Sequence, residues 1–258
     1  MENLDSEEKS RVPALTRGIQ ILNELQKHRT CTVSQLIKYT NLPRSSVYVL
    51  VEELIRLSLI RQNQDGSLQL WMKLISLGKS ASDFLNIRDL VVPKLDELLM
   101  HTDSLAAHYG VLEDDHAFYA IKMTSPNAVM RILSREGMEV SLVHAGLGKC
   151  LLAFQEDKVI ERIIKKLDYT PLTPTSIKTP EALLEELHKI RVKGWAFDNS
   201  EAESEIRCVA VPIFASDGAQ LLGAISLVGT ITKFSLTVID DIVDQVKDCA
   251  HKIEALLR

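Results

Sequence analysis

The chain has 258 residues, of which 46% are hydrophobic and 25% charged, and this balance excludes wholesale disorder and favours one or two globular domains. The longest uncharged stretch, residues 219–232, is too short to span a bilayer, and the acidic N-terminus lacks the apolar core of a secretory signal. The four cysteines lie far apart, without a CxxC pair or metal-ligand spacing. We therefore expect reduced thiols, a cytoplasmic protein without a membrane partner, and neither a metal nor a cofactor.

The net charge of −5 is distributed unevenly along the chain. Residues 1–8 carry four acids and no base, residues 9–80 carry eleven Lys and Arg against four acids, and residues 81–258 carry nineteen bases against twenty-seven acids. The three segments thus have charges of −4, +7 and −8. A basic segment joined to an acidic remainder is typical of nucleic-acid contact, although a solvated basic face would give the same pattern.

The basic segment opens with two predicted helices. Helical spacing of apolar residues predicts one buried face of a first helix, made by Leu15, Ile19, Leu22 and Leu25 or Gln26. Thr32 and Gln35 have the spacing of a capping box, which starts a second helix. This helix is expected to end at Asn41, because asparagine tolerates the left-handed conformation at a helix end.

A third helix is predicted after Pro43, which suits a first helical turn. Its buried stripe is expected to be Val47, Leu50, Val51, Leu54 and Leu57. The arrangement is that of a helix-turn-helix, in which the early residues of the last helix reach base edges. The alternative is that these residues only cap and solvate a surface helix.

Residues 59–62 and 67–70 flank Asp65-Gly66, which is a strong hairpin signal. A hairpin directly after a helix-turn-helix makes a winged helix, and its polar residues would contact phosphates or the minor groove. The sequence therefore predicts binding to double-stranded DNA. The expected DNA-binding residues are Ser34, Arg44, Ser45, Ser46, Tyr48, Val49, Arg61 and Asn63.

Residues 81–99 are predicted to form an apolar helix that breaks or kinks near Val92, because Pro93 follows. Such a helix either packs on one of the domains or pairs with its copy in a second subunit. We favour the dimer, since paired winged helices double their DNA contacts.

The acidic remainder mixes strands and helices. Predicted strands at 105–111 and 117–123 form one hairpin, residues 129–133 form another strand, and strands at 208–215 and 221–228 form a second hairpin. A helix from Pro180 to Gly194 and a final helix reaching Leu257 complete an α+β sensor domain with an antiparallel sheet. The turn at 216–219 could close on two or three residues, which decides whether Cys208 and Ser226 share a sheet face.

Fragments in both halves point to one family. They are residues 12–22, 42–47, 74–78, 146–149, 169–173, 194–198, 207–212 and 224–226. In this order and spacing, the chain resembles the IclR family of bacterial transcription regulators from Val12 to Arg258. The resemblance implies an acidic tail (1–10), a winged helix-turn-helix domain (11–73), a helical linker for dimerisation (74–102) and a GAF-like effector-binding domain (103–258). It also implies homodimers or homotetramers on pseudo-palindromic operators.

The resemblance further implies a binding site for a small anionic metabolite. Its expected residues are Gly146, Leu147, Asp198, Ile206, Cys208, Ser226 and Val228. Backbone N–H groups of Gly146 and Leu147 would hold a carboxylate, while Ser226 and Asp198 would bind hydroxyl or carbonyl groups. Taken alone, Cys208 is more typical of core packing, and Asp198 fits a turn or cap as well as it fits a ligand site.

The chain departs from the family pattern at several positions. Val49 stands where many relatives have arginine, Trp71 where a glycine is common after the wing, and Val228 where some relatives have a second serine. Ser141-Leu-Val143 replaces a common Pro-Leu-His. These differences leave the effector and the base readout open.

Three functions compete at this point. The first is a ligand-responsive regulator of a catabolic operon, more often a repressor than an activator in this family, that senses a sugar acid or a 2-oxo acid. The second is an enzyme with Cys208 or Cys150 as nucleophile and His144 or His108 as base; without a GxSxG or HExxH motif, we expect no catalytic residue. The third is a DNA-binding architectural protein without a ligand, against which the large acidic half argues.

Overall fold

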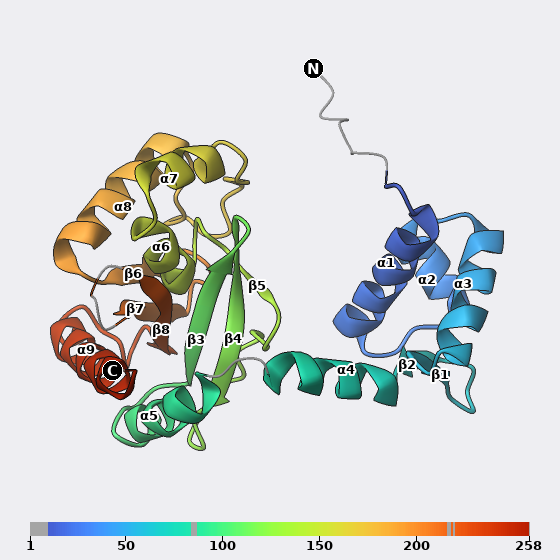
Figure 1. The fold of residues 1–258 in the computed structure, drawn as a ribbon, viewed down its shortest axis with the longest axis horizontal. Helices are drawn as coiled ribbons and strands as arrows, with labels where there is room; N and C mark the ends of the chain where they lie inside the picture. The colour runs from blue at the N-terminus through green and yellow to red at the C-terminus, as the bar shows by residue number, and fades with distance from the viewer. Residues whose placement is uncertain (1–9, 84–86, 216–217, 219, 258) are drawn as a thin grey trace. The chain divides into compact units, whose positions relative to one another are not determined.

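The computed structural model describes residues 10–83, 87–215, 218 and 220–257. Its contacts divide the chain into two compact units, residues 1–84 and 85–258. The first unit combines helices with a small hairpin, and the second is built on one antiparallel sheet (Figure 1). Within the described residues, no helix has the length and the apolar character needed to cross a membrane.

The first three helices are α1 (Pro13–His28), α2 (Val33–Thr40) and α3 (Arg44–Arg56). The predicted capping box is present, because the Gln35 amide donates to Thr32 Oγ1 (3.3 Å) and the Thr32 amide donates to Gln35 Oε1 (2.8 Å). Helix α2 ends at Asn41, whose φ of 52° is left-handed as expected. Local sequence rules therefore define the turn between α2 and α3.

The buried face of α1 differs from the prediction. Leu15 and Ile19 are 65% and 48% exposed, whereas Gly18, Ile21 and Leu25 face the core. The helix carries two apolar stripes, and spacing alone did not show which of them packs on α2 and α3. The other buried residues of this core are Cys31, Leu36, Val47, Val51, Leu54, Ile60 and Leu68.

The predicted wing is a hairpin of β1 (Ile60–Gln62) and β2 (Leu68–Leu70), in which Arg61 lies opposite Gln69. Gly66 adopts a φ of 80° in the connecting turn, a conformation that glycine takes without strain. Helix α4 (Met72–Asp83) follows the second strand.

The linker differs in part from the prediction. Helix α4 ends at Asp83 and helix α5 spans Arg88–Met100, while residues 84–86 of the predicted helix lie outside the described residues. Of the predicted break or kink near Val92, the break does not occur, since α5 continues through Pro93. Proline removes one backbone hydrogen bond, and we attribute the continuity to burial of one face of α5 in the second unit.

The sheet of the second unit has the order β5-β4-β3-β8-β7-β6, and all neighbouring strands are antiparallel. Its strands are β3 (Ala106–Glu113), β4 (His116–Thr124), β5 (Glu139–Val140), β6 (Ala196–Asn199), β7 (Ile206–Phe214) and β8 (Leu221–Thr230). Both predicted hairpins, β3–β4 and β7–β8, are confirmed.

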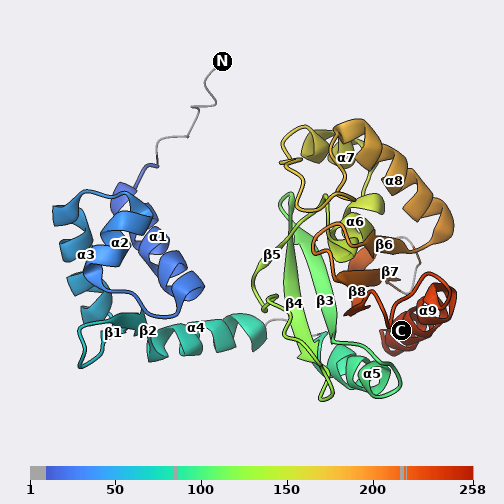
Figure 2. The same ribbon diagram turned by 180° about the vertical axis from the view of Figure 1, so that it is seen from behind.

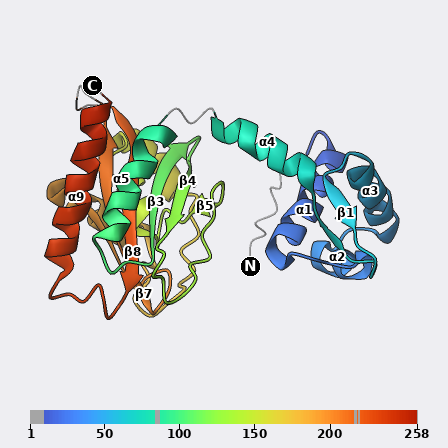
Figure 3. The same ribbon diagram turned by 90° about the horizontal axis from the view of Figure 1, so that it is seen from below.

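Helices cover both faces of this sheet. On one side lie α6 (Gly146–Ala153), α7 (Asp157–Ile164) and α8 (Pro180–Lys193), and on the other α5 and α9 (Ile239–Leu256) (Figures 2 and 3). The face toward α9 carries large residues such as Val209, Ile225 and Leu227. The face toward α6 carries alanines, which allow this entirely buried helix to lie close to the strands.

Residues 129–133 do not form the predicted strand. Instead, the Lys122 side chain binds backbone carbonyl oxygens in and next to this segment: Nζ donates to Ile132 O (2.8 Å) and to Ser134 O (2.5 Å). Val129 and Leu133 are 84% and 69% exposed. The strand that pairs with β4 at this edge of the sheet is β5.

Candidate nucleic-acid interface and effector site

The outward face of α3 carries the predicted DNA-binding residues. Arg44, Ser45, Tyr48 and Val49 are exposed and Ser46 is half-buried, whereas Val47, Val51 and Leu54 face the core. Val49 is 65% exposed, so an aliphatic side chain lies among the polar side chains of this face.

A surface hollow of about 290 Å³ adjoins this helix and is lined by Ala14, Arg17, Ser45, Ser46, Val49 and Leu50. It brings Arg17 of α1 beside three predicted DNA-binding residues. Sequence reasoning missed Arg17, because it sought DNA contacts only on the second helix, the third helix and the wing. The local charge of +7 was the signal that could have drawn attention to it.

The remaining predicted residues lie on two other elements of the same unit. Ser34 is exposed in the first turn of α2. On the wing, Arg61 Nη2 donates to Asn63 Oδ1 (3.3 Å), and the Arg61 guanidinium lies 3.8 Å from the centre of the Trp71 ring.

In the second unit, strand pairing brings the predicted effector residues together. Asp198 pairs with Cys208, and Cys208 pairs with Val228. Ile206 lies two residues before Cys208 on β7, and Ser226 lies two residues before Val228 on β8. All five therefore share the sheet face that α6 covers. This register answers the question left by the turn at 216–219, since Cys208 and Ser226 lie on one face.

The N-terminus of α6 packs directly against this group. A Cβ built on Gly146 would lie 3.2 Å from the Cys208 carbonyl oxygen and 3.3 Å from the Asp198 nitrogen. Leu147 fills the space beside Gly110 of β3. The Gly146 contacts show that this end of α6 faces the strands that carry Asp198 and Cys208. No side chain caps the helix there, so its first backbone N–H groups are not bound by a capping side chain.

A buried histidine lies in the same layer. The His108 ring hydrogen-bonds through Nδ1 to Ser226 Oγ (3.2 Å) and through Nε2 to Ser134 Oγ (2.8 Å). Burial, with a smaller contribution from Lys122, lowers the pKa of His108 to about 3, so the ring is neutral at physiological pH. From the sequence, His108 was a candidate only as a catalytic base; its contacts place it between Ser226 and the segment that follows β4.

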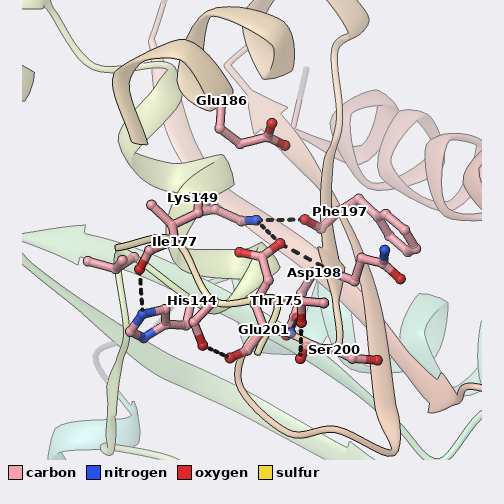
Figure 4. A network of polar contacts seen from close by, with 12 residues as sticks. His144, Lys149, Thr175, Ile177, Glu186, Phe197, Asp198, Ser200 and Glu201 are labelled. Atoms are coloured by element: carbon pink, nitrogen blue, oxygen red, sulfur yellow. Dashed lines mark hydrogen bonds and ion pairs between the residues drawn. The ribbon is translucent and has the colours of Figure 1, made fainter. Parts of the chain in front are cut away.

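A buried ion pair borders the group on the other side (Figure 4). Lys149 Nζ donates to Glu201 Oε1 (2.6 Å) and to the Phe197 carbonyl oxygen (2.7 Å), and its side chain is fully buried. The Glu201 amide donates to Asp198 Oδ1 (2.7 Å). Burial raises the pKa of Asp198 to about 7, so this carboxyl is partly protonated at neutral pH.

Polar side chains of the segment before α8 fix the loop that carries Glu201. Ser176 Oγ donates to the Glu201 carbonyl oxygen and Thr173 Oγ1 to the Ser200 carbonyl oxygen, each at 2.7 Å. In the described residues, Glu201 Oε2 is buried without a hydrogen-bond partner. Sequence reasoning did not find the Lys149–Glu201 ion pair, because the two residues are 52 positions apart in the chain.

Comparison with known proteins gives these two sites their context. Residues 14–64 match the model of the IclR helix-turn-helix domain, and residues 79–255 match that of the C-terminal domain of bacterial transcriptional regulator IclR. The chain belongs to the IclR family. It is a DNA-binding transcriptional regulator of a family whose members also bind small effectors.

Similar proteins of the IclR family share nearly the full length. The HTH-type transcriptional regulator RhmR of Escherichia coli K12 is 37% identical over 250 residues, which cover 97% of this chain and 95% of RhmR. KdgR of the same organism is 28% identical, with 95% and 92% covered. The crystal structure of Thermotoga maritima IclR superposes with a TM-score of 0.75 at 29% identity, and covers 96% of this chain and 99% of its own.

The geometry of this IclR-family chain gives no support to cysteine catalysis. Burial raises the pKa of the Cys208 thiol to about 12 and that of Cys150 well above its ordinary value, which disfavours the reactive thiolate. His108 is hydrogen-bonded to two serines, and His144 Nε2 lies 3.2 Å from the Ile177 carbonyl oxygen. Among the described residues, neither histidine hydrogen-bonds to a cysteine thiol.

Proposed function

We propose that this IclR-family regulator senses a small carboxylate, such as a sugar acid or a 2-oxo acid, and acts as the repressor of a catabolic operon. The observation that carries the proposal is the convergence of Asp198, Cys208 and Ser226 with the N-terminus of α6 on one buried sheet face. A helix N-terminus favours a negatively charged group, and the neighbouring hydroxyl and carboxyl offer partners for the polar groups of such an acid.

The local charges favour recognition by hydrogen bonds over general attraction. Glu201 offsets the charge of Lys149, and ionised Asp198 would add a negative charge beside an anionic ligand. Lys122, which lies opposite His108 on β4, is a cation on the same sheet face. We therefore expect the ligand carboxylate to depend on backbone N–H groups and on Lys122.

The fold is compatible with such a ligand. An IclR homologue from Microbacterium hydrocarbonoxydans, with a TM-score of 0.79 at 23% identity and 95% of this chain covered, was solved in complex with 4-hydroxybenzoate, which is a carboxylic acid. This supports a carboxylate as the chemical class, and leaves its identity to experiment.

We expect a homodimer or homotetramer of this chain to bind a double-stranded, pseudo-palindromic operator. Ser34, the start of α3 and the wing supply the contacts, joined by Arg17. Exposed apolar side chains support self-association of the first unit: Leu15 and Ile19 on α1, and Ile75 and Leu77 on α4, are 48% to 65% exposed. Because α5 buries its apolar face within the second unit, the linker's part in dimerisation would fall mainly to α4.

Ligand and operator would be coupled through the dimer. An acid that prefers one arrangement of the two subunits shifts operator affinity by that preference. We expect a thermal-shift screen of sugar acids, 2-oxo acids and aromatic acids to find a stabilising compound, because a ligand of the native state raises the unfolding temperature. If no carboxylic acid stabilises the protein while a neutral or cationic metabolite does, the proposed ligand class is wrong.

Repression is tested separately. Deleting the gene should raise transcription from the promoters to which the protein binds. A fall in transcription would make the protein an activator of the same family.

A further inference from the structure

The outward face of the wing carries an ordered set of polar and aromatic side chains. Arg61 of β1 and Asn63, which follows this strand, alternate with buried Ile60. Gln69 of β2 and Trp71, which follows it, alternate in the same way with buried Leu68. Asn63 Nδ2 donates to Ser67 Oγ (3.0 Å) and to Gln69 Oε1 (3.2 Å). The face is therefore organised by contacts between its own side chains.

Trp71 is positioned by the backbone of the hairpin. Its amide donates to the Leu59 carbonyl oxygen (2.8 Å), which extends the ladder one pair beyond Ile60 and Leu70. Residues 69 and 71 thus point to the same side, and Arg61, which lies opposite Gln69, is a diagonal neighbour of Trp71. The guanidinium carbon lies 3.8 Å from the ring centre, a distance typical of stacking.

Two contacts define the place of the Arg61 guanidinium. Its central carbon lies over the Trp71 ring, and Nη2 donates to Asn63 Oδ1 (3.3 Å). Within the described chain, Arg61 makes no ion pair, and the nearby Asp65 carboxylate accepts instead from the Ser67 amide and hydroxyl (3.0 and 2.7 Å). The positive charge therefore remains available to an external anion.

We propose that Trp71 is a positioning residue for DNA binding, which holds the Arg61 guanidinium flat on the wing so that its remaining N–H groups meet the DNA backbone. A flexible arginine loses rotamer freedom when it binds a phosphate, and a side chain ordered beforehand loses less. The inference rests on the proposed contact between the wing and DNA, and adds the residue that prepares it.

The probe is a fluorescently labelled duplex that the full-length protein itself enriches from a random-sequence pool, and affinity is read by anisotropy. Arg61→Ala should weaken binding and lower the salt slope by about one unit, as the loss of one phosphate contact does. Trp71→Leu retains an apolar side chain but no ring face. It should weaken binding by about three- to fivefold, the range of an exposed cation–π contact, and leave the salt slope near that of the parent.

Three further variants separate positioning from a general structural role. Trp71→Phe keeps a ring and should restore most of the affinity, whereas Arg61→Lys keeps the charge but not the flat stacking and should resemble Trp71→Leu. In the double variant Arg61→Ala/Trp71→Leu, the loss should equal that of Arg61→Ala alone, because Trp71 acts through Arg61.

The second tryptophan provides a matched control. The chain has two, and Trp195 of the second unit also has a cation above its ring, with Lys193 Nζ 5.5 Å from the centre. Trp195→Phe should leave DNA affinity unchanged and makes Trp71 the sole tryptophan. In that background, Arg61→Ala should alter Trp71 fluorescence before any DNA is added.

The outcomes distinguish the inference from the function on which it rests. If Arg61→Ala leaves affinity and salt slope unchanged, both the wing contact and the role of Trp71 are overturned. If Arg61→Ala weakens binding while Trp71→Leu does not, only the inference fails. If the losses in the double variant add, Trp71 contacts DNA independently and is not a positioning residue.

Discussion

The two units of this regulator place their candidate functional side chains in opposite environments. On α3, Tyr48 and Val49 are 46% and 65% exposed, whereas in the second unit Asp198 and Ser226 are 4% and 1% exposed. The two parts of the chain also differ in net charge, which is +7 for residues 9–80 and −8 for residues 81–258. One unit presents its polar groups to solvent, and the other encloses them beneath α6.

The difference teaches what each kind of site requires. DNA is a large external polyanion, so exposed cations attract it without a cavity. A small acid must be distinguished from other metabolites, and buried polar groups discriminate strongly, because a ligand that cannot hydrogen-bond to them leaves them unpaired. Substitutions in the first unit should therefore change affinity and salt dependence, and those in the second should change stability and ligand response.

Lys149→Ala is expected to give the largest effect. Removal of the lysine leaves the Glu201 carboxylate buried without its partner, which should reduce the free energy of unfolding by about 3–5 kcal/mol. Urea denaturation would measure the loss. Truncation of Lys166, a 68% exposed lysine that pairs with Asp115, is the matched control and should change stability little. Equal effects of the two truncations would contradict the buried-pair interpretation.

The pH dependence of stability comes next in size. Folded Asp198 keeps its proton up to about pH 7, whereas an unfolded aspartate releases it near pH 4, so this group's contribution falls as pH rises between these values by about 1.4 kcal/mol per unit. His108 acts in the opposite direction. Its folded pKa of about 3 lies below the unfolded value of about 6.5, so its contribution rises with pH over that interval.

The two groups therefore oppose each other between about pH 4 and 6.5, and single substitutions should separate them. Relative to the parent, Asp198→Asn should make stability rise more steeply with pH, and His108→Gln should make it rise less or fall. Glu201, whose pKa burial also raises, acts in the same sense as Asp198. Urea denaturation across this pH range measures both slopes; unchanged slopes in both variants would mean that neither group titrates as inferred.

Much of the first unit could be predicted because its signals are local. The contacts of Thr32 with Gln35, the left-handed Asn41 and the Asp65-Gly66 turn each depend on a few neighbouring residues. The face of α1 could not be predicted, because Ile19 and Ile21 belong to two apolar stripes and only the position of α2 and α3 decides between them.

The second unit depends more on contacts between distant residues. Both hairpins were predicted from alternation and turns, but residues 129–133 form no strand, and the Lys122 ammonium binds the carbonyl oxygens of Ile132 and Ser134. Likewise, Lys149 in the sequence gives no sign that Glu201 is its partner. The resemblance to the IclR family supplied the effector residues, whereas the contacts of His108 with two serines and the buried ion pair emerged only from the structure.

In the first unit, Arg44→Ala should weaken DNA binding by about tenfold or more and lower the salt slope by about one unit. Anisotropy titrations at several salt concentrations, with the duplex that the protein enriches, would measure both. Arg56 is the matched control on the same helix, because it lies in the last turn and its Nε donates to Glu53 Oε2 (2.8 Å). If Arg56→Ala causes the same loss, α3 does not approach DNA through its N-terminal turns.

Ser226→Ala tests the buried site with the smallest expected change, a loss of ligand affinity of about fivefold, which corresponds to one hydrogen bond. Affinity for DNA without ligand should remain unchanged.

Ser226 also hydrogen-bonds His108 Nδ1, so a loss of ligand response could arise indirectly from the histidine. Ser134→Ala controls for this, because it removes the hydroxyl that contacts His108 Nε2 from the other side. Both variants leave one ring nitrogen without its serine and should be similarly destabilised in urea. If only Ser226→Ala weakens the thermal shift produced by the ligand, the hydroxyl contacts the effector; if both weaken it equally, Ser226 serves to hold His108 and the proposed site must be redrawn around the ring.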